Sequence, residues 1–279
     1  IHGGSGGGGG STPSETMFTV YDLNTNKPVT DTKLNIIAAI TNNEIGNMSL
    51  SGEDFRNLCK AQAVAANSWV QHQYENQGTI PNVGLKYSGN YGAVKEAIFD
   101  VQSKVITYNG RTANTVYTSC NNGKTNSARN YLKTDAYPYL TVVDSPYDTQ
   151  VFRNKTMTRN EGQVANDIRK FSIDPYASGV AKSSWIQIIE RDPQTNYVTR
   201  VSLCGQEVPI SKFNENMIGP YSPDFNVNYS NGVWTFVANG NGHCMGLSQY
   251  GAYYYAIKPT KWYDILAIYF PGTKIEDRF

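Results

Sequence analysis

Apolar residues recur at helical spacing in two segments near the start of the chain. The first segment follows Asp31 and Thr32, either of which can cap a helix, and it should end around residues 42–44. The second begins at Ser51, and its apolar positions are Phe55, Leu58, Cys59, Ala65, Ala66, Trp69 and Val70. The sequence therefore predicts two consecutive amphipathic helices.

Strand and turn signals are interspersed with these helices. Residues 18–23 form a β-type run, and the Asn-Gly pairs at 109–110 and 231–232 predict two hairpins. The first hairpin should pair residues 105–108 with 115–118. Further elements are expected at 93–102 (helix), 160–171 (helix), from Trp185 onward (short strands) and 262–269 (helix). The pattern predicts an α+β fold.

Composition narrows the classes of function. The chain has 279 residues, with 24 Lys and Arg against 23 Asp and Glu, and it contains no apolar run long enough for a membrane span. Because the charges are so nearly balanced, the chain has no overall positive potential that would attract the phosphates of nucleic acid. The 20 tyrosines indicate a surface that can stack on sugars and hydrogen-bond to them.

Four cysteines stand at positions without C-x-x-C spacing: Cys59, Cys120, Cys204 and Cys244. The simplest interpretation is that each is a small buried hydrophobic residue. An alternative is a zinc site built from Cys120, His243 and Cys244, because zinc accepts both imidazole and thiolate. Disulfides remain a further alternative.

The first sixteen residues are rich in Gly and Ser. This composition is typical of a flexible linker or tag, or of the trimmed end of a longer precursor. We therefore expect the folded domain to occupy 17–279.

Five motifs occur in an order that resembles one known family. They are Lys60–Ala66 (KAQAVAA), Val105–Gly110 (VITYNG), Pro138–Asp148 (PYLTVVDSPYD), His243–Ala252 (HCMGLSQYGA) and Tyr269–Thr273 (YFPGT). Together they resemble the SpoIID/LytB family, named for the stage II sporulation protein D and the amidase-enhancer proteins. The resemblance covers about residues 18–275. It implies a SpoIID-like mixed fold with a glycan-binding cleft, and we expect an inserted lobe at about 150–235.

The resemblance also implies a catalytic acid. Residues 36–46 match the family segment that carries a single catalytic Glu, which places Glu44 in that role. Enzymes of the family are lytic transglycosylases of peptidoglycan, acting on strands whose peptides have been removed. A carboxyl that donates a proton at neutral pH needs an apolar, partly dry setting, which Ile40, Ile45 and Met48 could supply. No cofactor is required for this chemistry. The rival acid Glu53 precedes the second helix, where it would favour the helix dipole.

By the same resemblance, the substrate-binding residues are Ser119, His243, Ser248, Gln249 and Tyr250. The chain departs from the family pattern at two places. Asn67-Ser68-Trp69 replaces the usual Arg-Thr-Tyr, so an Arg that would bind substrate is absent. The loop of residues 118–123 lacks the usual Ser-x-Ser-Gly-Gly.

Three functions follow as alternatives. The first is a lytic transglycosylase of the cell wall or spore cortex, outside the cytoplasm, with peptide-stripped glycan as partner and an amidase or protease as an accessory partner. The second is a non-catalytic peptidoglycan-binding or amidase-enhancing module. The third is a zinc-dependent hydrolase that uses His243.

Overall fold

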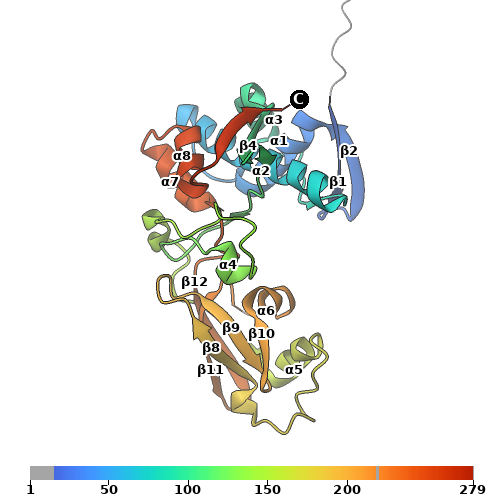
Figure 1. Cartoon of the computed structure of the whole chain (residues 1–279), viewed down its shortest axis with the longest axis vertical. Helices are drawn as coiled ribbons and strands as arrows, with labels where there is room; N and C mark the ends of the chain where they lie inside the picture. The colour runs from blue at the N-terminus through green and yellow to red at the C-terminus, as the bar shows by residue number, and fades with distance from the viewer. Residues whose placement is uncertain (1–15, 218–219, 279) are drawn as a thin grey trace, which may run out of the picture.

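The computed structural model describes residues 16–217 and 220–278, and it contains two groups of elements stacked along the long axis of the molecule (Figure 1). The expected Gly/Ser segment lies, up to residue 15, outside the described residues. The first group comprises β1 (Met17–Asp22), β2 (Lys27–Thr32), α1 (Lys33–Ile45), α2 (Gly52–Gln77), β3 (Asn82–Val83), α3 (Tyr91–Ile98), η1 (Phe99–Val101), β4 (Lys104–Tyr108), β5 (Arg111–Thr112), β6 (Tyr117–Thr118), β13 (Leu247–Ser248), α7 (Gln249–Ile257), α8 (Trp262–Tyr269) and β14 (Lys274–Asp277).

The second group is built from residues between these segments. Its elements are β7 (Lys155–Asn160), α5 (Glu161–Arg169), η3 (Lys182–Ser184), β8 (Ile186–Arg191), β9 (Val198–Leu203), β10 (Gln206–Pro209), α6 (Ile210–Asn216), β11 (Asp224–Ser230) and β12 (Val233–Asn239). The connecting stretch carries α4 (Ala128–Tyr131) and η2 (Pro146–Gln150). This second group overlaps the stretch in which we expect an inserted lobe.

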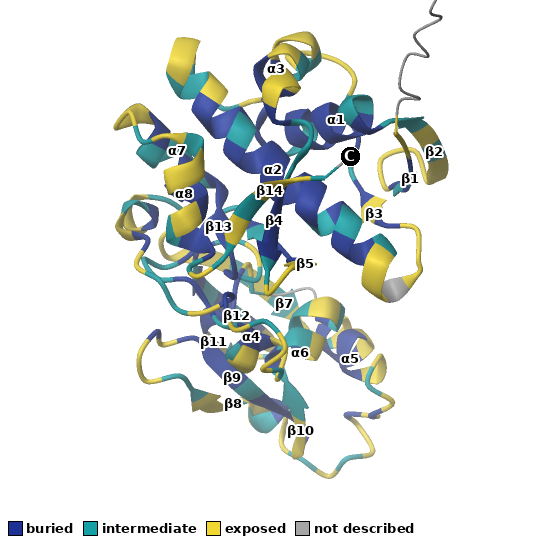
Figure 2. Cartoon of the chain, turned by 45° about the horizontal axis from the view of Figure 1, so that its top comes forward, coloured by how far each residue is buried: buried dark blue, intermediate teal, exposed yellow. Residues whose placement is uncertain are grey.

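Helix α2 is the centre of the first core. It packs against α1, α3, β4, α7 and α8, and most of its length is buried (Figure 2). Alanines and small polar residues let these neighbours approach closely. Ser68 accepts a hydrogen bond from the amide of Ile106 (2.8 Å), and Asn67 donates to the carbonyl of Lys104 (2.8 Å), so α2 holds β4 through side chains as well as through packing.

Two three-stranded antiparallel sheets, β10-β9-β8 and β11-β12-β7, supply the strands of the second core. Large aromatic side chains fill it. Trp185 stacks on Trp234 with ring centroids 5.5 Å apart, and Phe213 stacks on Phe225 at the same separation. The two groups of elements therefore have separate hydrophobic cores.

The expected hairpin after residue 104 is only partly correct. Strand β4 turns at Asn109-Gly110 and pairs with β5, but residues 115–118 do not continue that hairpin. Instead, β6 pairs in parallel with β13, so that Tyr117 lies opposite Leu247 and Thr118 opposite Ser248. This long-range pairing brings the segment after the hairpin to the motif at 243–252.

The other expected elements agree closely with the structure. The first two helices are α1 and α2, the hairpin around 231–232 is β11–β12, and the C-terminal helix is α8. The α+β class is confirmed. Within the described part of the chain, none of the helices combines the length and the apolar content that crossing a bilayer requires.

Candidate active site

Glu44 lies in the last turn of α1, where the chain is held from outside the helix. The side chain of Asn42 donates hydrogen bonds to the carbonyls of Lys86 (2.7 Å) and Ser88 (2.8 Å), which ties the loop after β3 to this helix end. The helix stops at Gly46, where a Cβ atom would lie only 2.1 Å from Asn42 Oδ1. Glu44 is therefore presented from a rigid helix end, half-buried rather than free in solvent.

The carboxyl of Glu44 contacts the motif at 243–252 directly. Gln249 Nε2 donates a hydrogen bond to Glu44 Oε2 at 2.8 Å. The other oxygen, Oε1, lies 3.5 Å from Asn43 Nδ2, which is the outer limit for a hydrogen bond. One oxygen of the carboxyl is thus held by an amide, while the other has a much weaker partner.

Glu44 lines two hollows, and it is the one residue that their linings share. The first hollow, of about 440 Å³, is lined by Glu44, Ile45, Asn47, Met48, Ser49, Ser119, Gln249, Tyr250, Tyr253 and Tyr254. The second, of about 320 Å³, is lined by Leu23, Glu44, Trp69, Asn82, Val83, Gly84, Val116, Tyr117 and His243. A ligand that extends through both hollows would pass the Glu44 carboxyl.

Two of the polar residues that line the second hollow, Tyr117 and His243, remain uncharged. Burial, and next the negative charge of Glu44, raise the pKa of Tyr117 well above its usual value, so its hydroxyl stays a proton donor. Burial lowers the pKa of His243 to about 4, which keeps the imidazole neutral. His243 Nδ1 accepts a hydrogen bond from the amide of Met245 (3.0 Å), so the neutral ring carries its proton on Nε2.

Three of the expected substrate-binding residues, Ser119, Gln249 and Tyr250, line the first hollow, and His243 lines the second. Ser248 differs from these four. Its side chain is fully buried, lines neither hollow, and accepts a hydrogen bond from the amide of Gly251 as the N-cap of α7. Ser248 thus fixes the start of the helix that carries Gln249, and its role in binding substrate stays a prediction.

A buried carboxyl supports that cap. Asp148 accepts hydrogen bonds from Ser248 Oγ (2.8 Å) and Ser145 Oγ (2.6 Å), and Ser145 Oγ also lies 2.7 Å from Tyr269 Oη. Burial raises the pKa of Asp148 to about 6, although the hydrogen bonds from both serines act in the opposite direction. These groups form a closed polar network beneath the first turn of α7.

The three residues of the alternative zinc site do not form a ligand cluster. Within 16–217 and 220–278, no three His, Cys, Asp or Glu side chains come together as a metal-binding group. All four cysteines are unpaired and buried. Burial raises the pKa of Cys120 to about 12 and holds the pKa of Cys244 well above its usual value.

Sequence reasoning did not single out Asn43, Trp69 or Tyr117 as site residues. Trp69 and Tyr117 reach the second hollow from α2 and β6. Trp69 occupies an apolar position in the helical pattern of α2, and Tyr117 belongs to a strand-like run. In the sequence, both therefore resemble residues of the hydrophobic core. Only the parallel pairing of β6 with β13 reveals that Tyr117 lies beside Glu44.

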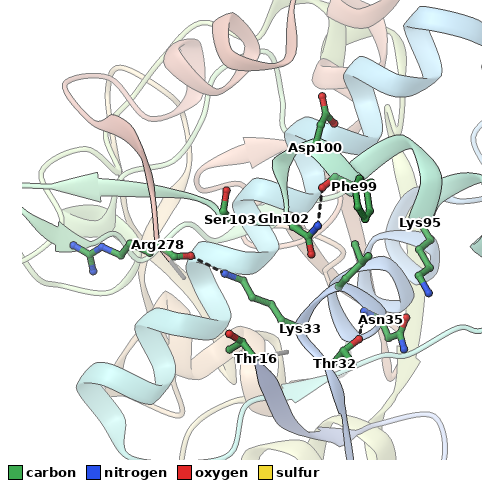
Figure 3. A pocket seen from close by; sticks show the side chains of 11 residues that line it. Thr16, Thr32, Lys33, Asn35, Lys95, Phe99, Asp100, Gln102, Ser103 and Arg278 are labelled. Atoms are coloured by element: carbon green, nitrogen blue, oxygen red, sulfur yellow. Dashed lines mark hydrogen bonds between the residues drawn. The ribbon is translucent and has the colours of Figure 1, made fainter. Parts of the chain in front are cut away.

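A further hollow of about 570 Å³ lies at the start of α1, about 16 Å along the helix from Glu44 (Figure 3). Lys33 crosses it to donate to the carbonyl of Arg278 (3.1 Å), and burial lowers the pKa of Lys33 to about 8. The carboxyl in its lining, Asp100, is paired with Lys60 at 2.6 Å. The carboxyl of this hollow is therefore neutralised by an ion pair, whereas the Glu44 carboxyl is held by the neutral amide of Gln249.

The chain is similar to known proteins at modest sequence identity. No protein-family profile matches the chain. The chain is 27% identical over 197 residues to proteins named Stage II sporulation protein D from Bacillus amyloliquefaciens and from Bacillus subtilis (strain 168). It is also 26% identical over 231 residues to an uncharacterised protein of Brachyspira hyodysenteriae.

These matches confirm the resemblance to the SpoIID family that the motifs indicate. They cover 70% of this chain for the two Bacillus proteins and 78% for the Brachyspira protein. The matched segments span 54% of each Bacillus protein and 61% of the Brachyspira protein.

Proposed function

We propose that the protein is a peptidoglycan lytic transglycosylase that acts outside the cytoplasm, in the cell wall or spore envelope. The observation that carries the proposal is the position of Glu44: one carboxyl, held by Gln249, lines two adjacent hollows. The names of the two Bacillus relatives support a role in sporulation.

The reaction needs one acid that later becomes a base. Protonated Glu44 gives its proton to the oxygen between N-acetylmuramic acid and N-acetylglucosamine, and that glycosidic bond breaks. The resulting carboxylate then takes the proton of the 6-hydroxyl of the muramic acid residue, whose oxygen bonds to the anomeric carbon. The product is a 1,6-anhydro sugar, Glu44 is protonated again, and no water or cofactor is consumed.

The surroundings of Glu44 suit both halves of this cycle. Ile45 and Met48 give the first hollow an apolar side next to the carboxyl. On the other side, the neutral hydroxyl of Tyr117 can donate to oxygen atoms of the substrate near the reacting bond. The two hollows would then accommodate the sugars on the two sides of that bond.

The test is digestion of purified peptidoglycan, both intact and stripped of its stem peptides, with product analysis by mass spectrometry. We expect products lighter by one water than hydrolytic muropeptides, released mainly from the stripped strands. The variant Glu44→Gln, which keeps the volume of the side chain but cannot transfer a proton, should release none.

Glu53→Gln is the matched control. Glu53 is an exposed acid in the first turn of α2, where it pairs with Arg56 and Lys261, and it lines neither hollow. Its variant should cleave as the unmodified protein does. Cleavage by Glu44→Gln would exclude Glu44 as the acid. If the unmodified protein binds stripped strands without releasing product, the protein is a peptidoglycan-binding module instead.

A further inference from the structure

A row of aromatic rings continues beyond the first hollow in both directions. Tyr250 and Tyr254 are four residues apart on α7, share one face of the helix, and both line the hollow with Glu44. The ring of Phe152 lies 6.3 Å from that of Tyr250, and the ring of Tyr147 lies 6.0 Å from that of Tyr254. We call Phe152, Tyr250, Tyr254 and Tyr147 the aromatic row. All four side chains are half-buried, so part of each ring is open to solvent.

A lysine lies over the ring at each end of the row. Lys155 Nζ is 5.7 Å from the ring centroid of Phe152, and Lys258 Nζ is 5.3 Å from that of Tyr147. Neither lysine forms an ion pair with another residue in the described ranges 16–217 and 220–278. The row thus carries a positive charge at each end, next to exposed aromatic surface.

Phe152 is held in an unusual backbone conformation. Its φ angle is +46°, in the left-handed region that a bulky residue rarely adopts. The carbonyl of Phe152 accepts a hydrogen bond from the amide of Gly240 at 2.9 Å, which fixes the residue against the end of β12. Backbone strain of this kind persists where the surrounding structure enforces it, and it clusters at ligand-binding positions.

We propose that the aromatic row is an extended glycan-binding track for an acidic amino-sugar polymer, which it binds outside the two sugars at Glu44. This inference rests on the proposed function and adds Tyr147, Phe152, Lys155 and Lys258 to the site. Aromatic faces stack on the apolar faces of sugar rings. The two lysines pair with carboxylates carried by the sugars.

The charge gives the track a preference between two forms of the same polymer. Each muramic acid residue carries a lactyl carboxylate, which is free after its peptide is removed and becomes an uncharged amide when the peptide is attached. Lys155 and Lys258 can pair with the lactyl carboxylate beside the ring in the first form, whereas the amide of the second form carries no charge at that position. The track therefore supplies a physical reason for a preference for peptide-stripped strands.

The experiment measures affinity rather than cleavage, in the Glu44→Gln background so that the glycan stays intact. Isothermal titration calorimetry measures the affinity for soluble peptide-stripped fragments of two and of eight sugars. The affinities of Phe152→Ala and of Tyr147→Ala, each in this background, are compared with those of Glu44→Gln alone. We expect each variant to weaken binding of the eight-sugar fragment by about 3- to 10-fold, the effect of one aromatic contact, and to leave binding of the two-sugar fragment unchanged. Tyr263→Ala, which removes an exposed ring of α8 outside the row, is the control and should change neither.

A second comparison tests the charges. The double variant Lys155→Gln, Lys258→Gln should lose affinity for the stripped eight-sugar fragment but keep its affinity for an eight-sugar polymer of N-acetylglucosamine, which has no carboxylates. Equal losses for both polymers would overturn the role of the lysines. Unchanged eight-sugar binding in both ring variants, or an equal loss for the two-sugar fragment, would overturn the track. The ring variants can also be titrated with the eight-sugar polymer of N-acetylglucosamine, which lacks the bond that the proposed reaction cleaves. The track is therefore tested even if Glu44→Gln still cleaves stripped glycan.

Discussion

Gln249 donates a hydrogen bond from its side-chain amide to the carboxyl of Glu44, at 2.8 Å and across 205 positions of sequence. In the sequence, the two residues lie far apart within the first group. Glu44 is at the end of its first helix, α1, and Gln249 is at the start of α7, which follows the whole second group. The contact fixes one carboxyl oxygen, while the other has only a weak partner in Asn43 Nδ2 at 3.5 Å.

Gln249→Ala should therefore reduce cleavage without removing the acid itself. A carboxyl that rotates freely is misaligned for most of the time, and losses of about 100-fold are typical of such misplacement. We expect the loss in kcat, measured by release of anhydro products from stripped glycan, with the free energy of unfolding little changed. Gln187→Ala, at an exposed position of β8, is the control. A Gln249→Ala variant with unchanged kcat would show that the amide does not position Glu44.

Tyr117→Phe tests the hydroxyl in the second hollow. Because burial raises the pKa of Tyr117 well above its usual value, the hydroxyl remains a donor at neutral pH. Its removal should lower kcat/KM by about tenfold, equivalent to roughly 1.4 kcal/mol, without shifting the pH at which cleavage is fastest. A shift in that optimum would mean that Tyr117 itself titrates during the reaction.

Asp148→Asn should change how stability depends on pH. In the folded protein the pKa of Asp148 is raised to about 6, whereas an unfolded Asp titrates near 3.8. Between these values the folded state binds more protons than the unfolded state, so this group's contribution to stability falls as the pH rises from about 4 to 6. Above pH 6 the ionised carboxyl costs about 3 kcal/mol relative to its protonated form.

The variant lacks this cost because Asn does not titrate. The unfolding free energy of Asp148→Asn minus that of the unmodified protein should become more positive by about 3 kcal/mol between pH 3.5 and pH 7, as measured by urea denaturation. Asp144→Asn, an exposed acid of the same motif that pairs with Lys124, provides the comparison. A difference that stays constant with pH would contradict the raised pKa.

Gly246→Ala should be strongly destabilising. Gly246 has a φ angle of +63°, and an added Cβ atom would lie 2.1 Å from the carbonyl oxygen of Val116. Gly205 also has a positive φ angle, +85°, but nothing lies within 4 Å of its Cβ position. Gly205→Ala should cost only the conformational strain, about 1 kcal/mol, whereas Gly246→Ala should cost clearly more and separate β6 from β13. Equal urea midpoints for the two variants would exclude the clash.

Local signals in the sequence predicted most helices because each is specified within its own segment. Thr32 caps α1 as expected, accepting a hydrogen bond from the amide of Asn35, and α8 has the expected bounds. The start of α7 was not expected, because its apolar pattern is weak and its N-cap Ser248 lies within a motif that we interpreted as ligand-binding. The role of Ser248 depends on Asp148, a hundred residues away, and no local pattern reports such a contact.

The residues of the candidate site also divide into those that the sequence predicts and those that only long-range contacts reveal. Glu44, Gln249 and Tyr250 could be found because they match family motifs, whereas Trp69 and Tyr117 could not, because each resembles a core residue in its own segment. The missing information is the pairing of β6 with β13, which is a long-range event. Residues that meet only through such a pairing leave no periodic signal in the sequence.

Strand β14, near the end of the described residues, pairs with β4, and Lys33 at the start of α1 donates to the carbonyl of Arg278. During synthesis the ribosome therefore releases the second group of elements as a continuous stretch before the first group can close. We expect the second core to form earlier on the ribosome, which pulsed proteolysis of stalled nascent chains can measure. Glu44 would then meet Gln249 only after residues 155–239 have been synthesised, so a chain that stops within the second group lacks this contact.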